Sequence, residues 1–133
     1  MQEFLFKIGL GWIWERLTGR RQLRLLVHKA NFRNNPTPFY FINATNLSKS
    51  RELEITHVWF DTKPEVPVLE PTRPLPKRLK PDESWETWIG VNQISPTSNQ
   101  NPYELARAKL SSGKVIKSKK NENVPSQGAV PGP

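Results

Sequence analysis

Histidines and carboxylates are the residues of this 133-residue chain that could catalyse a reaction or hold a metal, and only two histidines are present. His57 and Asp61 share a face of a predicted strand, but four strand residues separate them by about 13 Å, too far for a direct hydrogen bond. No close-spaced ligand pair accompanies His28 or His57, and the chain has no cysteine. We therefore expect no metal site, no cofactor and no catalysis. We predict that His57 fills a semi-buried sheet position and that His28 faces solvent.

Basic residues are concentrated at the two ends of the chain. The net charge is +8, and residues 1–33 and 101–133 together hold thirteen of the twenty Lys and Arg. Such ends favour an anionic surface, whether phospholipid headgroups, nucleic acid or an acidic protein. A soluble protein with ordinary lysine-rich ends is the alternative. The candidate contacts are Arg16, Arg20, Arg21, Arg24, Lys117, Lys119 and Lys120.

Residues 4–14 are almost continuously apolar and aromatic. The run lacks the features of a secretory signal and is about half the length of a membrane span. Its spacing predicts a helix over residues 1–19, with one docking face formed by Phe6, Leu10, Ile13, Trp14 and Leu17. That face could pack on the chain's own domain, on a membrane surface or on a partner protein. Gly9 and Gly11 weaken the helix, which favours packing on its own domain.

From residue 22 onward the pattern alternates with the period of β-strands. Strands are expected over residues 22–32, 39–46, 52–61 and 85–91, with a short edge strand at 66–69 and a hairpin of 103–110 with 114–118 around Gly113. We expect the strands at 39–46 and 52–61 to pair with each other. Residues 73–81 are expected to cross to the opposite sheet.

The expected core consists of apolar residues from alternate strand positions, with Trp88 outside it. Its members are Leu23, Leu25, Val27, Tyr40, Ile42, Ile55, Trp59, Leu79, Trp85, Ile89 and Leu105. The composition after residue 118 is too polar to fold, so residues 119–133 are expected to be a flexible tail. One β-domain over residues 20–118 remains.

Two turns carry a resemblance to a known architecture. The strand ending in Asn46-Leu47-Ser48, and the later run Leu79-Lys80-Pro81-Asp82-Glu83, resemble turns of the immunoglobulin-like sandwiches of bacterial adhesion and accessory domains. The resemblance covers about residues 22–118 and implies architecture, not activity. This chain lacks the cysteine pair of antibody domains and has Asp82 where glycine is common. It also resembles small bacterial proteins of this layout.

The sequence therefore predicts a mostly β protein: an immunoglobulin-like antiparallel β-sandwich of six to seven strands, with an N-terminal α-helix and a disordered C-terminal tail. As a function we expect a non-catalytic interaction or accessory module, with another protein as its partner. It would be cytoplasmic, with peripheral contact to the inner face of a membrane through the helix as one option. The alternative is a basic, nucleic-acid-associated protein.

Overall fold

The strands follow the alternation of apolar residues, with two short additions. The computed structural model describes residues 22–119, and this range contains eight strands against the six to seven expected. The strands are β1 (Leu23–Ala30), β2 (Phe39–Asn46), β3 (Leu53–Phe60), β4 (Val66–Pro67), β5 (Lys77–Leu79), β6 (Ser84–Gly90), β7 (Ala106–Leu110) and β8 (Val115–Lys117). Two 3-10 helices, η1 (Val91–Gln93) and η2 (Pro102–Glu104), lie between β6 and β7. The helix predicted for residues 1–19 lies outside the described residues, as does the predicted tail after Lys119.

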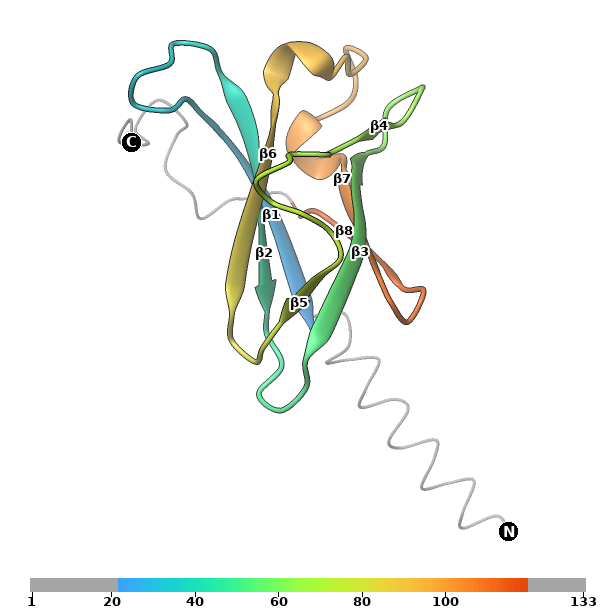
Figure 1. Ribbon diagram of the computed structural model, residues 1–133. Coiled ribbons are helices and arrows are strands. Elements are labelled where there is room, and N and C mark those ends of the chain that lie inside the picture. The colour runs from blue at the N-terminus through green and yellow to red at the C-terminus, as the bar shows by residue number, and fades with distance from the viewer. Residues whose placement is uncertain (1–21, 120–133) are drawn as a thin grey trace, which may run out of the picture.

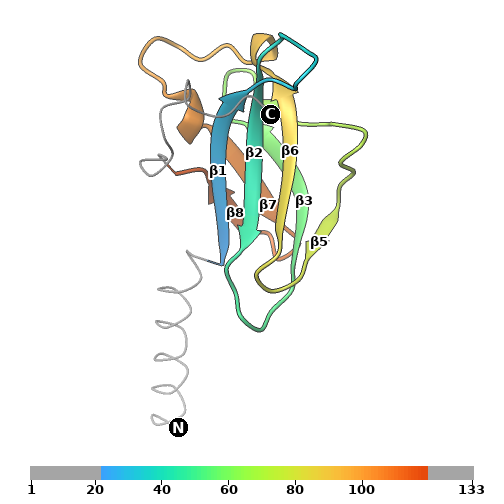
Figure 2. The ribbon, with the colours of Figure 1, turned by 90° about the vertical axis from the view of Figure 1, so that its left-hand side faces the viewer.

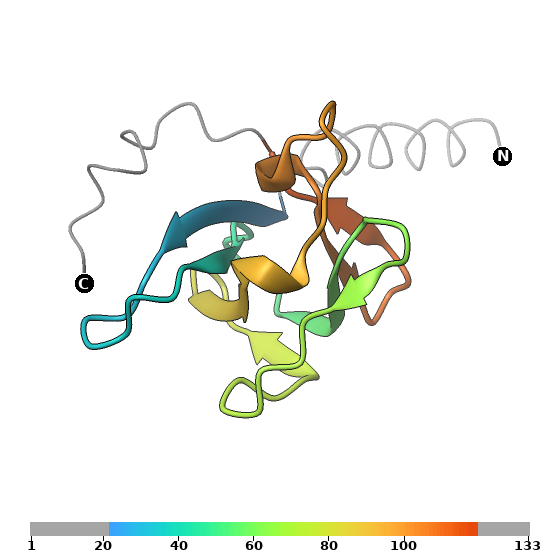
Figure 3. The same ribbon diagram turned by 90° about the horizontal axis from the view of Figure 1, so that it is seen from above.

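The strands form two antiparallel sheets that face each other (Figures 1 and 2). One sheet has the order β1-β2-β6, and the other has the order β4-β3-β7-β8, with β5 also pairing with β3. The view from above shows the two layers (Figure 3), and the buried apolar side chains of both sheets form one core. The expectation of a mostly β, antiparallel sandwich is therefore confirmed at this level.

The predicted pairing of the second and third strands is wrong. β2 pairs with β1 and β6, whereas β3 lies in the other sheet and pairs with β4, β5 and β7. The connection over residues 47–52 crosses from one sheet to the other, as expected when both strands present an apolar face to the same interior.

Asn46 fixes that crossing. Its side chain is fully buried, and Nδ2 donates to the carbonyl oxygens of Arg51 at 2.8 Å and of Leu79 and Lys80 at 3.1 Å each. Its Oδ1 accepts from the Ser48 N–H at 2.9 Å. Both of the turns that carry the sequence resemblance are therefore held together by one amide, which closes this end of the sandwich.

The second of these turns needs a left-handed residue. Asp82 has φ of 62°, a value that glycine adopts most readily, and its N–H donates to the Asn46 carbonyl oxygen at 2.9 Å. The change of sheet occurs here, because Leu79 still pairs with Leu53 of β3. The expectation that residues 73–81 make the crossing is thus corrected: the segment joins the β3 sheet first and crosses only after Leu79.

Most of the predicted core is confirmed. Nine of the eleven candidates are buried, while Trp85 is half-buried and packs against the core from its edge. The prediction for Trp59 is wrong, because Trp59 is half-buried outside the core whereas Phe60 beside it has no exposed surface.

A β-bulge explains the error at Trp59. The pairing of β3 with β7 shifts register between Ile55 and His57, so that Thr56 is an extra residue in β3. Because side chains alternate strictly along a regular strand, one extra residue exchanges the two faces beyond it. Ile55, Val58 and Phe60 therefore point inward, and Trp59 is on the outer face.

The segment that follows the C-terminal hairpin joins the two sheets along the edge where β8 lies near β1. Gly113, with φ of 94°, allows the predicted turn between β7 and β8. After β8, the buried Ser118 donates from Oγ to the Tyr103 carbonyl oxygen at 2.9 Å and accepts from the Ala106 N–H at 3.1 Å. The Lys119 N–H then donates to the Leu25 carbonyl oxygen of β1 at 3.2 Å.

Candidate functional site

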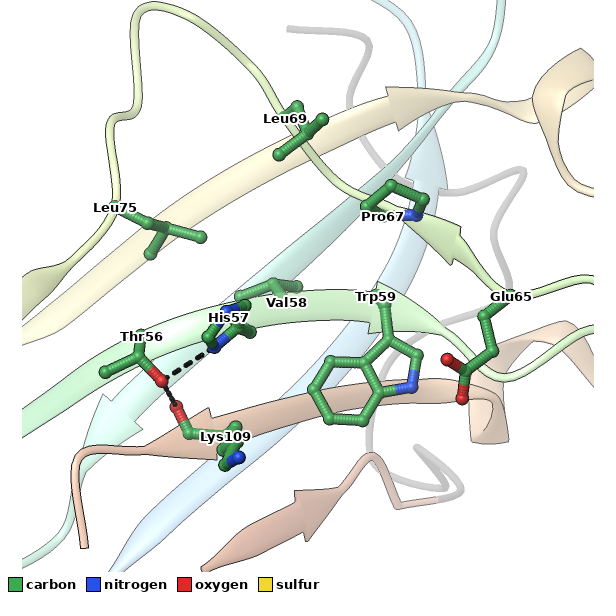
Figure 4. A pocket seen from close by; sticks show the side chains of 9 residues that line it. All are labelled: Thr56, His57, Val58, Trp59, Glu65, Pro67, Leu69, Leu75 and Lys109. Carbon is green, nitrogen blue, oxygen red and sulfur yellow. Dashed lines mark hydrogen bonds between the residues drawn. The ribbon is translucent and has the colours of Figure 1, made fainter. Parts of the chain in front are cut away.

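An apolar groove runs along one edge of β3 (Figure 4). Along this edge, β5 pairs with β3 as far as Ile55, and β4 pairs with β3 from Trp59 onward. Between Ile55 and Trp59 neither strand pairs with β3, because the chain that connects β4 to β5 runs away from it there. The groove has a volume of about 590 Å³ and is mostly apolar, a size typical of ligand and side-chain pockets. We call it the Trp59 groove. It is lined by Thr56, His57, Val58, Trp59, Glu65, Pro67, Leu69, Leu75 and Lys109.

Leu69 is the most exposed large apolar side chain among residues 22–119. Its side chain is 74% exposed although it follows the fully buried Val68. Val68 is held by its N–H, which donates to the Val58 carbonyl oxygen at 2.9 Å, so Leu69 is directed away from the interior. Val115, at 45% exposure, is the other large apolar side chain that the structure leaves exposed among residues 22–119. It lies on the same sheet as the groove.

The bulge also fixes the polar rim of the groove. Thr56 Oγ1 donates to the Lys109 carbonyl oxygen at 3.1 Å, and His57 Nδ1 lies 2.9 Å from the same hydroxyl. His57 is exposed and His28 is half-buried, with its ring stacked on Phe41 at 5.3 Å. The expected environments of the two histidines are therefore reversed. The bulge turns His57 outward, and the aromatic ring of Phe41 covers His28.

Cationic side chains follow the groove across the sheet. The β7–β8 hairpin carries Arg107, Lys109, Lys114 and Lys117 and no acidic residue. We call it the cationic hairpin. Arg107 is only 12% exposed and its Nη2 lies 3.4 Å from Asp61 Oδ2, while its Nη1 donates to two backbone carbonyl oxygens. Arg107 is thus held in place by the protein itself.

The basic residues predicted to meet an anionic surface are divided between the two sheets. Arg24 is exposed on the outer face of the β1-β2-β6 sheet, and Lys117 is exposed on the outer face of the other sheet. Lys119 lies between them, beside Leu25. The remaining predicted site residues lie outside the described part of the chain: Phe6, Leu10, Ile13, Trp14, Arg16, Leu17, Arg20, Arg21 and Lys120.

The outer face of the β1-β2-β6 sheet is covered by aromatic rings. Phe41, at 6% exposure, packs against Phe32 and Trp88 with ring centroids 5.2 and 5.7 Å apart, and Phe39 packs on Phe32 at 5.3 Å. The Arg73 guanidinium lies 5.1 Å from the Trp88 ring. The placement of Trp88 outside the main core is confirmed. The rings of this cluster therefore pack mainly on one another.

Two carboxyls near that face, Glu86 and Glu70, have pKa values shifted by their surroundings. Burial raises the pKa of Glu86, and the nearby His28 and Arg73 offset part of the rise. His28 Nε2 lies 3.9 Å from Glu86 Oε2. In contrast, hydrogen bonds from Thr72 lower the pKa of Glu70, with smaller contributions from Trp88 and Arg73. Shifted carboxyls of this kind also occur in structural networks on packed surfaces.

Sequence reasoning missed the groove residues Leu69, Leu75 and Lys109 as a site. An isolated leucine in a proline-rich connection gave no periodic signal, and only the tertiary pairing of β3 brings that connection beside Trp59. The bulge that exposes Trp59 likewise has no glycine or proline to mark it.

Comparisons with known proteins found no match: no family model, no curated protein and no solved structure resembles this chain closely enough to be matched. Within residues 22–119, no helix has the length and apolar character needed to cross a membrane. In the same range, no three His, Asp or Glu side chains are grouped closely enough to hold a metal ion.

Proposed function

We propose that this chain is a non-catalytic interaction module built on an immunoglobulin-like β-sandwich, and that it binds another protein through the Trp59 groove. The strand order supports the architecture, since the β1-β2-β6 sheet packs against a second antiparallel sheet in which β3, β7 and β8 are neighbours.

The observation that carries the proposal is that the exposed Leu69 and the outward-facing Trp59 line the same groove of about 590 Å³. Exposed apolar side chains that line one concave surface are typical of interaction sites. Aromatic anchors in concave surfaces also supply much of the affinity at protein interfaces.

A library of displayed random peptides tests this function. The full chain and its Trp59→Ser/Leu69→Ser variant are used as baits in parallel. We expect peptide families that are enriched on the wild-type protein and lost on the variant, because the variant removes the two apolar walls of the groove. Leu26→Ser, on the outer face of the opposite sheet, is the matched control and should keep the same peptides. If no peptide distinguishes the wild type from the groove variant, the proposed function is wrong.

Nucleic-acid association is the second candidate, and one observation favours it. Trp59 is the direct cross-strand neighbour of Arg107, which is in turn the neighbour of Lys117, so an aromatic ring and cations share one face. Titration of fluorescent single-stranded and duplex DNA over a range of salt concentrations checks this function. Binding without a salt-dependent slope, or no binding at low salt, would eliminate it.

Membrane contact through the helix predicted for residues 1–19 also stays a prediction, as does a cytoplasmic location. Sedimentation of the full chain and of a chain lacking residues 1–18 with anionic vesicles tests the contact. We expect the full chain to sediment at low salt and the shortened chain to stay in solution if the apolar head contacts the headgroups.

A further inference from the structure

The groove and the cationic hairpin form one continuous surface on the outer face of the β3 sheet. The cross-strand register places Pro67, Trp59, Arg107 and Lys117 in one row over four strands. The next row contains His57, Lys109 and the exposed Val115. Side chains that are partners in antiparallel register point to the same face of a sheet, so the apolar groups of the groove and the cationic groups of the hairpin share one face.

Lys109 and Lys117 differ from Arg107 because their charges are free to bind a partner. Among residues 22–119, no carboxylate lies within ion-pair distance of Lys109 or Lys117, and both residues are exposed. Arg107 instead pairs with Asp61 and stays mostly covered. Exposed lysines beside an apolar groove can attract a negatively charged partner, because no described carboxylate already neutralises them.

The acids of the surface lie at its other end. Glu65 lines the groove on the side of β4, and Asp61 follows β3. Lys109 and Lys117 lie on the side of β7 and β8. The surface is therefore polarised, with an apolar centre, acids on one side and available cations on the other.

We propose that this surface binds a short acidic segment of a partner protein, with a bulky apolar residue in the Trp59 groove and carboxylates against Lys109 and Lys117. The inference rests on the proposed function and adds the chemistry of the partner. Neighbouring strands are about 4.8 Å apart, so Lys117 is about 10 Å across the sheet from Trp59. An extended chain covers that distance in about three residues, which sets the spacing between the apolar anchor and the acid.

Charge complementarity favours a partner over the chain's own ends. Residues 1–21 hold four Lys and Arg against two acids, and residues 120–133 hold one of each. Neither end offers the acidic cluster that Lys109 and Lys117 would attract.

The same polarity favours a peptide over a nucleic acid. A nucleic acid carries phosphates on both sides of any stacked base. One of these phosphates would lie near the Glu65 carboxylate and be repelled by it. A peptide can carry its acids on one side of the anchor only. Besides Trp59, the apolar lining of the groove is aliphatic, formed by Val58, Leu69 and Leu75, and this lining suits a leucine or similar side chain.

Binding of labelled synthetic decapeptides to the full chain tests the inference by fluorescence polarisation. The acidic probe has two central leucines followed, three residues later, by three glutamates. One comparison peptide has lysines in place of the glutamates, and another has serines in place of the leucines. We expect only the acidic probe with leucines to bind, with an affinity that falls as salt rises.

Charge-matched variants locate the contact. Lys109→Glu and Arg24→Glu change the net charge equally but lie on opposite sheets. We expect Lys109→Glu to weaken binding of the acidic probe on the order of tenfold, Lys109→Glu/Lys117→Glu to weaken it further, and the charge-matched Arg24→Glu to leave it nearly unchanged. Trp59→Ser should also weaken it. Because all four residues lie outside the core, circular dichroism should show that every variant stays folded.

Three outcomes overturn the inference. They are a lysine peptide that binds as tightly as the acidic probe, an Arg24→Glu variant that weakens binding as much as Lys109→Glu does, and single-stranded DNA that binds more tightly than the probe in a Trp59-dependent way. If library peptides need Trp59 but carry no acids, the proposed function stands and this inference fails. If no peptide of any composition needs Trp59, both fail.

Discussion

At the scale of single residues, buried polar groups contribute more to this fold than the exposed ion pairs of Lys49 and Arg78 do. The ion pairs of Lys49 and Arg78 are exposed, and exposed pairs contribute little to stability. Asn46 and Ser118, by contrast, are buried and bridge segments that are far apart in the sequence.

Replacement of Asn46 by Ala should lower the free energy of unfolding by about 2–4 kcal/mol, because it leaves several buried backbone groups without their partner. Asn43→Ala, three residues earlier on the outer face of the same strand, should cost less than about 1 kcal/mol. Urea denaturation of both variants measures the difference. Equal costs would show that the amide of Asn46 does not close this end of the sandwich.

The raised pKa of Glu86 predicts a pH dependence of stability. Because the folded state favours the protonated carboxyl, ionisation is harder in the folded than in the unfolded chain, and stability is lost as the pH rises from about 4 through the raised pKa. Glu86→Gln removes this loss, so its thermal midpoint should exceed that of the wild type by a margin that grows between about pH 4 and pH 7.

The control for Glu86 is Glu65→Gln, in which an exposed carboxylate on the other sheet is replaced. Its midpoint relative to the wild type should change little over the same pH range. A margin for Glu86→Gln that shrinks with rising pH would mean that folding lowers the pKa of this carboxyl instead of raising it.

At the scale of elements, the bulge in β3 decides which of two adjacent aromatic residues belongs to the core. Phe60→Ala should lower the free energy of unfolding by about 3–5 kcal/mol, as expected for a fully buried ring. Trp59→Ala should cost less than about 1.5 kcal/mol, because its ring lines an open groove. Chemical denaturation of the two variants side by side checks this order, and the reverse order would place Trp59 inside.

The strands differ in whether they could be predicted from the sequence. β1, β2, β3, β6 and the last hairpin could be predicted because their apolar residues alternate and their turns carry Asn, Pro or Gly. The pairing of β2 with β6 could not be predicted, because no feature of the neighbouring sequence indicates which sheet a strand joins after a connection that crosses between sheets. The groove could not be predicted either, because it depends on the bulge at Thr56 and on a proline-rich connection brought beside β3 by pairing distant in sequence.

At the scale of the whole molecule, the two sheets are tied at one end by Asn46 and along one edge by the segment after β8. Ser118→Ala should lower the free energy of unfolding by about 1–3 kcal/mol, because the Ala106 N–H and the Tyr103 carbonyl oxygen lose their shared partner. Ser112→Ala, in the exposed hairpin loop, should change it by no more than about 0.5 kcal/mol. Thermal unfolding followed by circular dichroism compares them, and similar midpoints would rule out a role for Ser118 in holding this edge.

Because of the bulge at Thr56, an insertion or deletion in β3 would change which side chains form the groove. Ile55 and Trp59 are an even number of residues apart, yet they point to opposite faces because of the extra residue between them. A one-residue deletion there would turn the indole toward Ala106 and Ala108, which are fully buried and leave little space for it. Selection would therefore act on the length of this strand as strongly as on its residues, and an unchanged spacing would mark descendants that keep the groove.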